Sequence, residues 1–307
     1  MGGGVRFRPG ARPQRPRGPS RGAIDVLTHP ALARLHPTYG HPESEQRLAV
    51  LLDAFPQARE GKAASRKALE RVHAHEYLKV LEELKEPGWF DYPNTLASAT
   101  SWEACLLAAG CAIEAAETGA FALVRPPGHH APPSGAMGFC LVNNVAIAAR
   151  HMQAEHDVER IAIVDFDVHH GNGTQDVFDG DDSVLYVSLH QVGIYPGTGA
   201  AGEGGATTVN VPLAPGGGDA EWLRAFDAHV EPAVTAFAPE LLLVSAGFDA
   251  HEEEDIYLVD MHVTDDGFRE LARRCAALAP RVAAVLEGGY NLETLPRLVA
   301  AALDGFP

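Results

Sequence analysis

The sequence lacks a long apolar run, a cysteine framework and a linker that would divide the chain. No stretch approaches the roughly 20 apolar residues that a membrane-spanning helix needs, which argues against a membrane protein. The 307 residues include only four cysteines and no CxxC pair. In a chain of this length we expect reduced, buried thiols of a cytoplasmic protein rather than disulfides or zinc ligands. The cysteines are Cys105, Cys111, Cys140 and Cys275.

Basic residues are also scarce. The chain has 24 Lys and Arg against 41 Asp and Glu, a formal net charge of −17. Such a charge repels nucleic-acid phosphates, so a nucleic-acid partner is not expected. It attracts polyamines and lysine-rich peptides instead. A homo-oligomer is compatible with this composition.

Residues 1–22 differ from the rest of the chain. They contain six arginines, no acidic residue and many Gly and Pro. They also lack the apolar stretch of about 7–15 residues found in a secretory signal. We expect a disordered basic leader, because such a segment buries too little apolar surface to fold; an anion-binding arm is the alternative. Residues 23–307 are expected to form a single catalytic domain.

After the leader, short apolar runs alternate with segments of helical spacing, which predicts βαβ units and a parallel sheet covered on both faces. Most of the apolar runs end in polar, Gly-rich turns. The expected strands are 120–124, 161–164, 184–187, 241–244 and 282–286. The expected helices are 47–55, 69–84, 102–117 (with Gly119 as C-cap), 144–155, 221–237 and 264–278.

Polar side chains follow these strands, and ligands bind at the carboxyl ends of strands in parallel sheets. Asp167 and His169 stand two residues apart and therefore point to the same side of an extended strand end. Asp249, after a neighbouring strand, completes a set of three N/O ligands, the pattern of a catalytic zinc site. The alternative is that these residues only cap loops and bind water.

The adjacent His129 and His130 lie on the same predicted edge, with Asp165 and Asn172 as candidate orienting partners. A histidine there suits the role of general base, because its ordinary pKa lies near 6.5. A carboxylate partner favours the charged ring, whereas an amide orients the ring with less stabilisation of charge. The alternative to a catalytic role is that the two histidines lie at the surface or form a buried hydrogen-bonded pair.

Tyr290 follows two glycines at another strand end. A tyrosine in such a place ordinarily belongs to the core or the rim. Opposite a metal ion, its hydroxyl could donate a hydrogen bond to the oxyanion that develops on an attacked carbonyl. Gly288 and Gly289 give the backbone the freedom to bring the ring into place.

The motifs RPPGHH, DFDVHHGNGTQ, VSLHQ, YPGTG, SAGFDAH and EGGYN, with HPESEQRL at 41–48, resemble the histone deacetylase family in its class II-like branch. That branch includes bacterial acetylpolyamine amidohydrolases and deacetylase-like amidohydrolases. The resemblance implies an α/β fold of the arginase/deacetylase type, with a central, mostly parallel eight-stranded sheet flanked by helices. It also implies zinc at Asp167, His169 and Asp249.

The same resemblance implies roles for the neighbouring residues. His130 would be the general base and then the general acid, His129 an electrostatic partner held by Asp165, and Tyr290 the group that polarises the acetyl carbonyl. Phe139 and Tyr195 match the walls of a narrow substrate tunnel, and Gly138 a glycine that lines it. A structural potassium ion would use Asp165, Asp167, His169, Ser188 and Leu189.

Three positions depart from the family pattern. Asn172 stands where class I members carry Asp, a variation that tunes the site and does not change which family the sequence resembles. Asn94 stands where many relatives place a rim Asp that grips the substrate. The usual Asp-Pro-Leu-Gly segment is replaced by the acidic run Glu252-Glu253-Glu254-Asp255-Ile256-Tyr257, which is either a solvated charge run or a rim that selects a second ammonium group.

The residues, with the function that the resemblance implies, predict a zinc-dependent deacetylase that releases acetate from acetyl-lysine or from a small cationic acetylated amine. A binuclear manganese ureohydrolase of the arginase type is an alternative, but it needs a second set of bridging Asp and His ligands. A catalytically weak acyl-lysine binding module is the other alternative. Retention of Tyr290 and of all three ligand positions argues against it.

Overall fold

The computed structural model describes residues 24–91, 93–256 and 258–306. The predicted leader, residues 1–22, lies outside the described residues. Within them, helices and strands alternate from Val26 to Gly305. The alternation expected from the sequence is therefore present.

A single eight-stranded sheet forms the centre of the molecule. Its strands are β1 (Val26–Thr28), β2 (Arg59–Glu60), β5 (Phe121–Ala122), β6 (Ile161–Asp165), β7 (Val184–Gln191), β8 (Thr208–Leu213), β10 (Leu241–Ala246) and β12 (Val282–Leu286). They are ordered β2-β1-β5-β12-β10-β6-β7-β8, and every pairing is parallel. The expected central sheet is confirmed.

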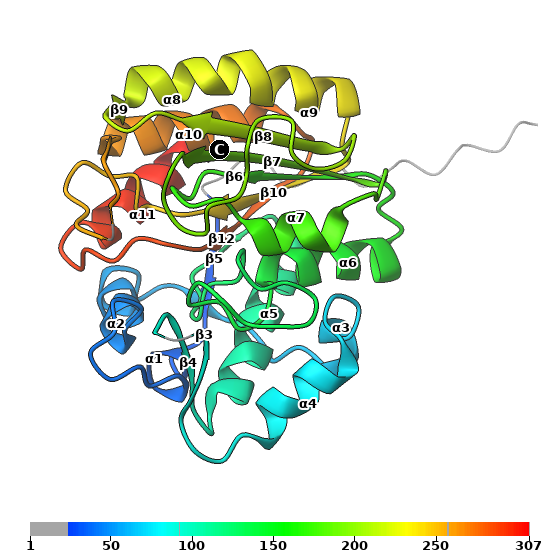
Figure 1. The fold of residues 1–307 in the computed structure, drawn as a ribbon, viewed down its shortest axis with the longest axis vertical. Helices are drawn as coiled ribbons and strands as arrows, with labels where there is room; N and C mark the ends of the chain where they lie inside the picture. Colours follow the sequence, from blue (N-terminus) through cyan, green and yellow to red (C-terminus); the bar gives the residue numbers. More distant parts are fainter. Residues whose placement is uncertain (1–23, 92, 257, 307) are drawn as a thin grey trace, which may run out of the picture.

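Helices cover both faces of this sheet. They are α1 (Leu32–Leu35), α2 (Glu45–Ala54), α3 (Arg66–Leu69), α4 (His75–Glu83), α5 (Ser101–Thr118), α6 (Asn144–His156), α7 (Asn172–Phe178), α8 (Asp219–Ala225), the π-helix η1 (Phe226–Val230), α9 (Glu231–Phe237), α10 (Asp265–Ala277) and α11 (Leu295–Gly305). In Figure 1, α8 and α9 lie on one side of β6, β7 and β8, and α6 and α7 lie on the other. All residues of β6, β7 and β10 are buried, as strands covered on both faces require.

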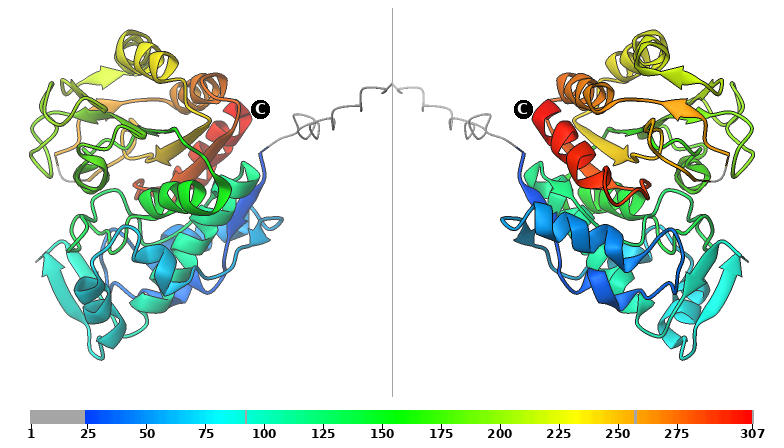
Figure 2. Two further views of the ribbon diagram at one scale, coloured as in Figure 1. Left: turned by 90° about the vertical axis from the view of Figure 1, so that its right-hand side faces the viewer. Right: turned by 90° about the vertical axis from the view of Figure 1, so that its left-hand side faces the viewer.

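Two small sheets lie outside the central one. β9 (Gly217–Gly218) pairs in parallel with β11 (Met261–His262), and β3 (Gly88–Asp91) pairs antiparallel with β4 (Thr95–Ala97). Figure 2 shows the cyan segments, which include β3, β4 and α4, at the opposite end of the molecule from the yellow helices α8 and α9. The β3–β4 turn carries Asn94.

Local signals account for several helix ends. The Asn143 side chain accepts a hydrogen bond from the Ala146 N–H at the start of α6, and the Thr264 side chain does the same for Gly267 at the start of α10. Gly119 ends α5 with φ +74°, a left-handed conformation that favours glycine, as predicted. Between α8 and α9, η1 ends directly before the first turn of α9, which contains Pro232.

The predicted helix 69–84 is wrong in its first part. The chain forms α3 and α4 instead, with an extended residue, Ala74 (ψ 137°), before α4. Tertiary hydrogen bonds explain the break: the Ala74 N–H donates to the Pro133 carbonyl at 2.8 Å, and the His73 ring accepts from the Asn143 N–H at 2.8 Å. These contacts override the local helical pattern.

Candidate active site and metal centre

The carboxyl ends of β6, β7, β10 and β12 meet at one edge of the sheet. Asp165, the last residue of β6, is in register with Ser188 of β7 and with Ser245 of β10. The polar segments that follow these strands are therefore neighbours in space. This edge holds the residues singled out in the sequence.

Asp167, His169 and Asp249 converge at this edge. Their ligand atoms all lie within 4.8 Å of one another. His169 Nδ1 is 3.1 Å from Asp167 Oδ1 and 3.1 Å from Asp249 Oδ2. All three residues are buried. The predicted ligand set is thus brought together, with one nitrogen and two carboxylate groups facing one point.

Backbone groups hold the two carboxylates in place. The Val168 N–H donates to Asp249 Oδ1 at 3.0 Å, and the N–H groups of His169 and Gly288 donate to the two oxygens of Asp167 at 2.9 and 2.8 Å. Two glycines leave the necessary room. A Cβ on Gly247 would lie 2.1 Å from Asp167 Oδ2, and one on Gly288 would lie 2.1 Å from Asp249 Oδ2. Gly288 is therefore required for packing, whereas Gly289, with φ +110°, supplies the backbone freedom.

The electrostatics of this cluster favour a positive charge between the carboxylates. Burial raises the pKa of Asp249, and the nearby charge of Asp167 raises it further. Burial alone would lower the pKa of His169, but its hydrogen bonds to the carboxylates of Asp167 and Asp249, which accept them, raise it to about 9. A buried imidazole nitrogen with two carboxylates is a donor set that zinc accepts. The residues present therefore fit a divalent cation.

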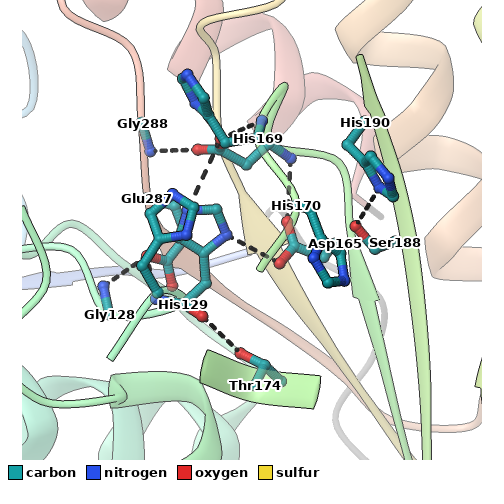
Figure 3. A network of polar contacts seen from close by, with 12 residues as sticks. Gly128, His129, Asp165, His169, His170, Thr174, Ser188, His190, Glu287 and Gly288 are labelled. Atoms are coloured by element: carbon teal, nitrogen blue, oxygen red, sulfur yellow. Dashed lines mark hydrogen bonds and ion pairs between the residues drawn. The ribbon is translucent and has the colours of Figure 1, made fainter. Parts of the chain in front are cut away.

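His129 belongs to a buried network beside this cluster. Its Nδ1 lies 3.1 Å from Asp165 Oδ2, which also accepts a hydrogen bond from the Tyr186 hydroxyl at 3.0 Å. Figure 3 shows His129 between Asp165 and Glu287. Burial disfavours the charged ring, but Asp167 and Asp165 outweigh it and raise the pKa of His129 to about 10. A carboxylate partner thus favours the charged form, as expected.

His130 has the opposite environment. Its Nδ1 donates to Asn172 Oδ1 at 2.9 Å, so Nε2 is left as the basic atom. Burial lowers its pKa well below the ordinary value, and the charges of His129 and His169 lower it further. The ring therefore stays neutral near pH 7, the state that a general base needs.

A cavity of about 220 Å³ opens onto His130 and His169. It is lined by Asn94, His130, Gly138, Phe139, His169, Tyr195, Ile256, Leu258 and Tyr290. All four predicted substrate-contacting residues are therefore brought together with the ligand His169. Burial raises the pKa of Tyr290 well above its ordinary value, so its hydroxyl remains a hydrogen-bond donor.

Aromatic rings form the walls of this cavity. The rings of Tyr195 and His130 pack edge to face, with their centroids 5.1 Å apart. The rings of Phe139 and Tyr290 do the same, with their centroids 5.5 Å apart. Gly138 has φ +56°, and a Cβ there would lie 2.4 Å from the His130 ring. Only glycine lets the two walls approach this closely.

The rim contains a carboxylate that the sequence interpretation missed. Asp91, at the end of β3, accepts a hydrogen bond from the Tyr195 hydroxyl at 3.1 Å. The Asn94 backbone carbonyl contacts His41 Nε2 at 3.0 Å, and the His41 ring meets Phe139 edge to face at 4.3 Å. Asn94 thus lies at the rim, as predicted, with Asp91 as its acidic neighbour.

A buried charge network behind the site was also missed. Arg125 and Arg47 both pair with Glu43. Arg47 also donates to the backbone carbonyls of Glu287 (2.6 Å) and Gly289 (2.7 Å). Burial raises the pKa of Glu43, but Arg125, His36 and Arg47 outweigh it and hold that pKa at about 2. The motifs HPESEQRL and RPPGHH contain Glu43, Arg47 and Arg125. The sequence thus showed the charged residues but not that they pair with one another.

The remaining predicted residues lie at the same edge. Ser188 is buried, and its hydroxyl hydrogen-bonds His190 Nδ1 at 2.9 Å. Leu189 is buried beside it. The potassium site at Asp165, Ser188 and Leu189 stays a prediction.

Two other groups of donor residues are close enough to hold a metal in the described part of the chain. They are Glu117, His151 and His156 at the surface, and His129, Cys140 and Glu287 in the interior. Neither group shares a ligand with Asp167, His169 and Asp249. A binuclear centre needs bridging ligands, so this arrangement does not favour the arginase-type alternative.

Comparisons with known proteins agree with this geometry. Residues 41–306 match the model of the histone deacetylase domain. The chain belongs to the histone deacetylase family. It is 40% identical over 301 residues to a "Probable deacetylase" of Archaeoglobus fulgidus, covering 87% of this chain and 82% of that protein. It is 38% identical over 287 residues to the "Histone deacetylase-like amidohydrolase" of Pseudomonas aeruginosa, covering 86% and 75%.

Plant members are similar as well. "Histone deacetylase 10, chloroplastic" of Oryza sativa subsp. japonica is 38% identical over 326 residues, covering 92% of this chain and 73% of that protein. The crystal structure of the HDA15 HD domain superposes with a TM-score of 0.84 at 33% identity, covering 91% of this chain and 89% of that one. The fold is therefore that of the arginase/deacetylase class.

Family membership supports a deacetylase, a hydrolase of amide bonds in an acetylated substrate. None of the helices in the described part of the chain combines the length and the apolar character that crossing a lipid bilayer requires.

Proposed function

We propose that this protein is a zinc-dependent deacetylase that hydrolyses the acetyl amide of a cationic substrate, either acetyl-lysine or an acetylated polyamine. One observation carries the proposal. The ligand set Asp167, His169 and Asp249 lies beside a cavity that also presents a neutral His130 and a protonated Tyr290. That combination is what amide hydrolysis requires.

Zinc held by Asp167, His169 and Asp249 would supply a Lewis acid and would lower the pKa of the attacking water. His130 Nε2 would take the proton from that water while Asn172 holds Nδ1. As negative charge develops on the carbonyl oxygen, the Tyr290 hydroxyl would donate a hydrogen bond to it. The site thus provides a base and an oxyanion donor around one carbonyl.

In the second half of the reaction, His130 would return its proton to the nitrogen of the leaving amine as the C–N bond breaks. The products are acetate and the free amine. His129, held in the charged form by Asp165, would keep the neighbouring ring of His130 from binding its proton too tightly. Phe139 and Tyr195 would enclose the apolar chain that leads to the amide.

The substrate class follows from charge. The net charge of −17 and the rim carboxylate of Asp91 both favour a cation outside the cavity. A potassium ion at Asp165, Ser188 and Leu189, and a cytoplasmic location, complete the proposal.

Metal analysis and acetate release test this proposal together. The purified protein should contain one zinc per chain at the Asp167 site and should release acetate from acetylputrescine, acetylspermidine or an acetyl-lysine peptide. His130→Ala and Tyr290→Phe should each lower kcat by about 10²–10³ or more while zinc stays bound. Gln153→Ala, a change on α6 outside the cavity, serves as a control.

Several results would contradict the proposal. Zinc binding without hydrolysis of any acyl-amine substrate would indicate the binding-module alternative. Two manganese ions per chain, with hydrolysis of a guanidino compound, would indicate the arginase-type alternative. Full activity of both variants would refute the roles given to His130 and Tyr290.

A further inference from the structure

The acidic loop after Asp249 is attached to the segment that carries Tyr290. One oxygen of Glu254, Oε2, accepts hydrogen bonds from the backbone N–H groups of Tyr290 (2.8 Å) and Asn291 (3.2 Å). The Glu253 carbonyl accepts from the Asn291 side chain at 2.8 Å, and the Glu253 carboxylate pairs with Arg297. The run that the sequence left as either a solvated charge run or a rim that selects a second ammonium group is therefore partly structural.

Tyr290 needs such an attachment. It follows Gly288 and Gly289, and Gly289 has φ +110°, a conformation that other residues rarely adopt. Gly289 lets the backbone turn into this conformation, and the turn brings the Tyr290 ring toward the site. A cavity of about 400 Å³ on this side is lined by Pro42, Glu254, Asp255, Ile256, Tyr290 and Asn291. Tyr290 borders this cavity, so the hydrogen bonds to its backbone N–H supplement the contacts that its ring makes with Phe139 and Arg47.

Opposite partners hold the same segment through its carbonyl groups. Arg47 donates to the carbonyl oxygens of Glu287 and Gly289, and its guanidinium carbon lies 4.7 Å from the centre of the Tyr290 ring. Glu254 binds the N–H groups of the next two residues. A guanidinium and a carboxyl group thus hold the backbone around Tyr290, and both hold the peptide group between Gly289 and Tyr290.

We propose that Glu254 is a positioning residue, whose carboxylate fixes the Tyr290 backbone so that the phenol hydroxyl faces the reacting carbonyl. This inference rests on the proposed function, in which Tyr290 donates to the developing oxyanion. Glu254 does not line the cavity that presents His130 and His169. Its whole effect is transmitted through Tyr290.

Length, rather than charge, is the property of Glu254 that the arrangement uses. Glutamine has the same length and an oxygen that can accept from both N–H groups. Aspartate keeps the charge, but its shorter side chain cannot reach both amides. Alanine removes the acceptor altogether. Glu252, an exposed carboxylate in the same loop, provides a matched control.

Steady-state kinetics on the zinc-loaded enzyme test the proposal. Glu254→Ala and Glu254→Asp should lower kcat about 10- to 100-fold, with KM and zinc content nearly unchanged, because misplacing a catalytic group by about 1 Å has an effect of this size. Glu254→Gln should keep most of the activity, and Glu252→Ala all of it. In a Tyr290→Phe background, Glu254→Ala should cause little further loss, since both changes act through one hydroxyl.

Other outcomes would overturn the inference. It fails if Tyr290→Phe is impaired while Glu254→Ala is as fast as the wild type, or if the two losses multiply in the double variant. It also fails if Glu254→Gln is slower than Glu254→Asp, because charge would then matter more than reach. That comparison stands even if Glu254→Ala does not fold. Full activity of Tyr290→Phe would instead refute the proposed function.

Discussion

At the scale of single residues, two neighbouring imidazoles acquire different properties from their partners. The centroids of the His129 and His130 rings are 4.0 Å apart. His129 faces the Asp165 carboxylate, which stabilises its charged form, whereas His130 faces the Asn172 amide, which does not. The pair thus places a charged ring next to a neutral one. The charged neighbour helps to lower the pKa of His130, as the proposed proton transfer requires.

Gly288 offers a direct test of the metal centre. We expect Gly288→Ala to lose most of its bound zinc and of its activity, because the new Cβ would lie 2.1 Å from Asp249 Oδ2 and 2.5 Å from Asp167 Oδ2. Zinc content by atomic spectroscopy, with affinity from competition with a chelator, measures the effect. Gly135→Ala is the control, since a Cβ there would meet only the Pro132 side chain at 3.8 Å. Unchanged zinc affinity in Gly288→Ala would contradict the location of the site.

Spacing and strand position in the sequence were enough to predict that some of the polar side chains meet at one edge of the sheet. Asp167 and His169 share a side of one strand end, and Asp249 follows the adjacent strand, so the convergence of these three residues follows from the topology. Glu254 and Glu287 could not be found in this way. Each binds the backbone N–H groups of a segment distant in sequence, and such amides carry no residue-type signal.

At the scale of elements, the chain departs from its own local pattern where a tertiary contact competes with a helix. Residues 69–84 have helical spacing, yet the helix stops after Leu69 and resumes at His75. His73, in the break, accepts from the Asn143 N–H through Nε2 and therefore donates through Nδ1 to the Pro132 carbonyl (3.2 Å). This neutral ring links the break to the start of α6.

Stability should therefore depend on pH through His73. Burial lowers its pKa from 6.5 to about 4. Between these values the unfolded chain binds more protons than the folded one, so stability falls as the pH falls through this window. Through His73, the free energy of unfolding should decrease by about 2 kcal/mol between about pH 7 and about pH 5. Urea unfolding of the wild type and of His73→Gln at both pH values measures this contribution.

The non-titrating variant should lose less stability than the wild type over the same range. Other buried histidines with lowered pKa values, such as His36, contribute equally to both proteins and cancel in the comparison. Parallel losses in the two proteins would show that His73 is not protonated on unfolding in this range.

Strands show the same dependence on context. The predicted central strands were recovered because their residues are apolar throughout and buried on both faces. β1, β2 and β8 lie toward the edges of the sheet. Both residues of β2 are exposed, and four of the six residues of β8 are only partly buried, so neither strand gives a continuous apolar run. Pairing with an existing strand defines them more than their own composition does.

At the scale of the whole molecule, a buried charge network behind the site connects segments that lie far apart in the sequence. Glu43 lies just before α2, Arg125 follows β5, and Arg47 of α2 reaches the carbonyls after β12. Segments distant in sequence are thus bound to one carboxylate. Removing Glu43 would leave two buried guanidinium groups without their partner, a strongly destabilising change.

The overall charge leads to a prediction about substrate capture. A net charge of −17 should draw a cationic substrate toward the protein over a distance set by the ionic strength. Raising the salt from about 0.01 M to about 1 M shortens the screening length from about 30 Å to about 3 Å. We therefore expect kcat/KM for acetylputrescine to fall several-fold. The rate for N-butylacetamide, a neutral amide of similar length, should change little.

This comparison separates long-range attraction from chemistry at the proposed zinc site, because both substrates would present the same acetyl amide to Tyr290 and His130. The acidic surface acts only on the substrate that carries an ammonium group. An equal salt dependence for the two amides would mean that the −17 charge plays no part in selecting the substrate. A cationic substrate that is favoured at every salt concentration by the same factor would instead place the selectivity in short-range contacts at the rim, where Asp91 lies beside Tyr195.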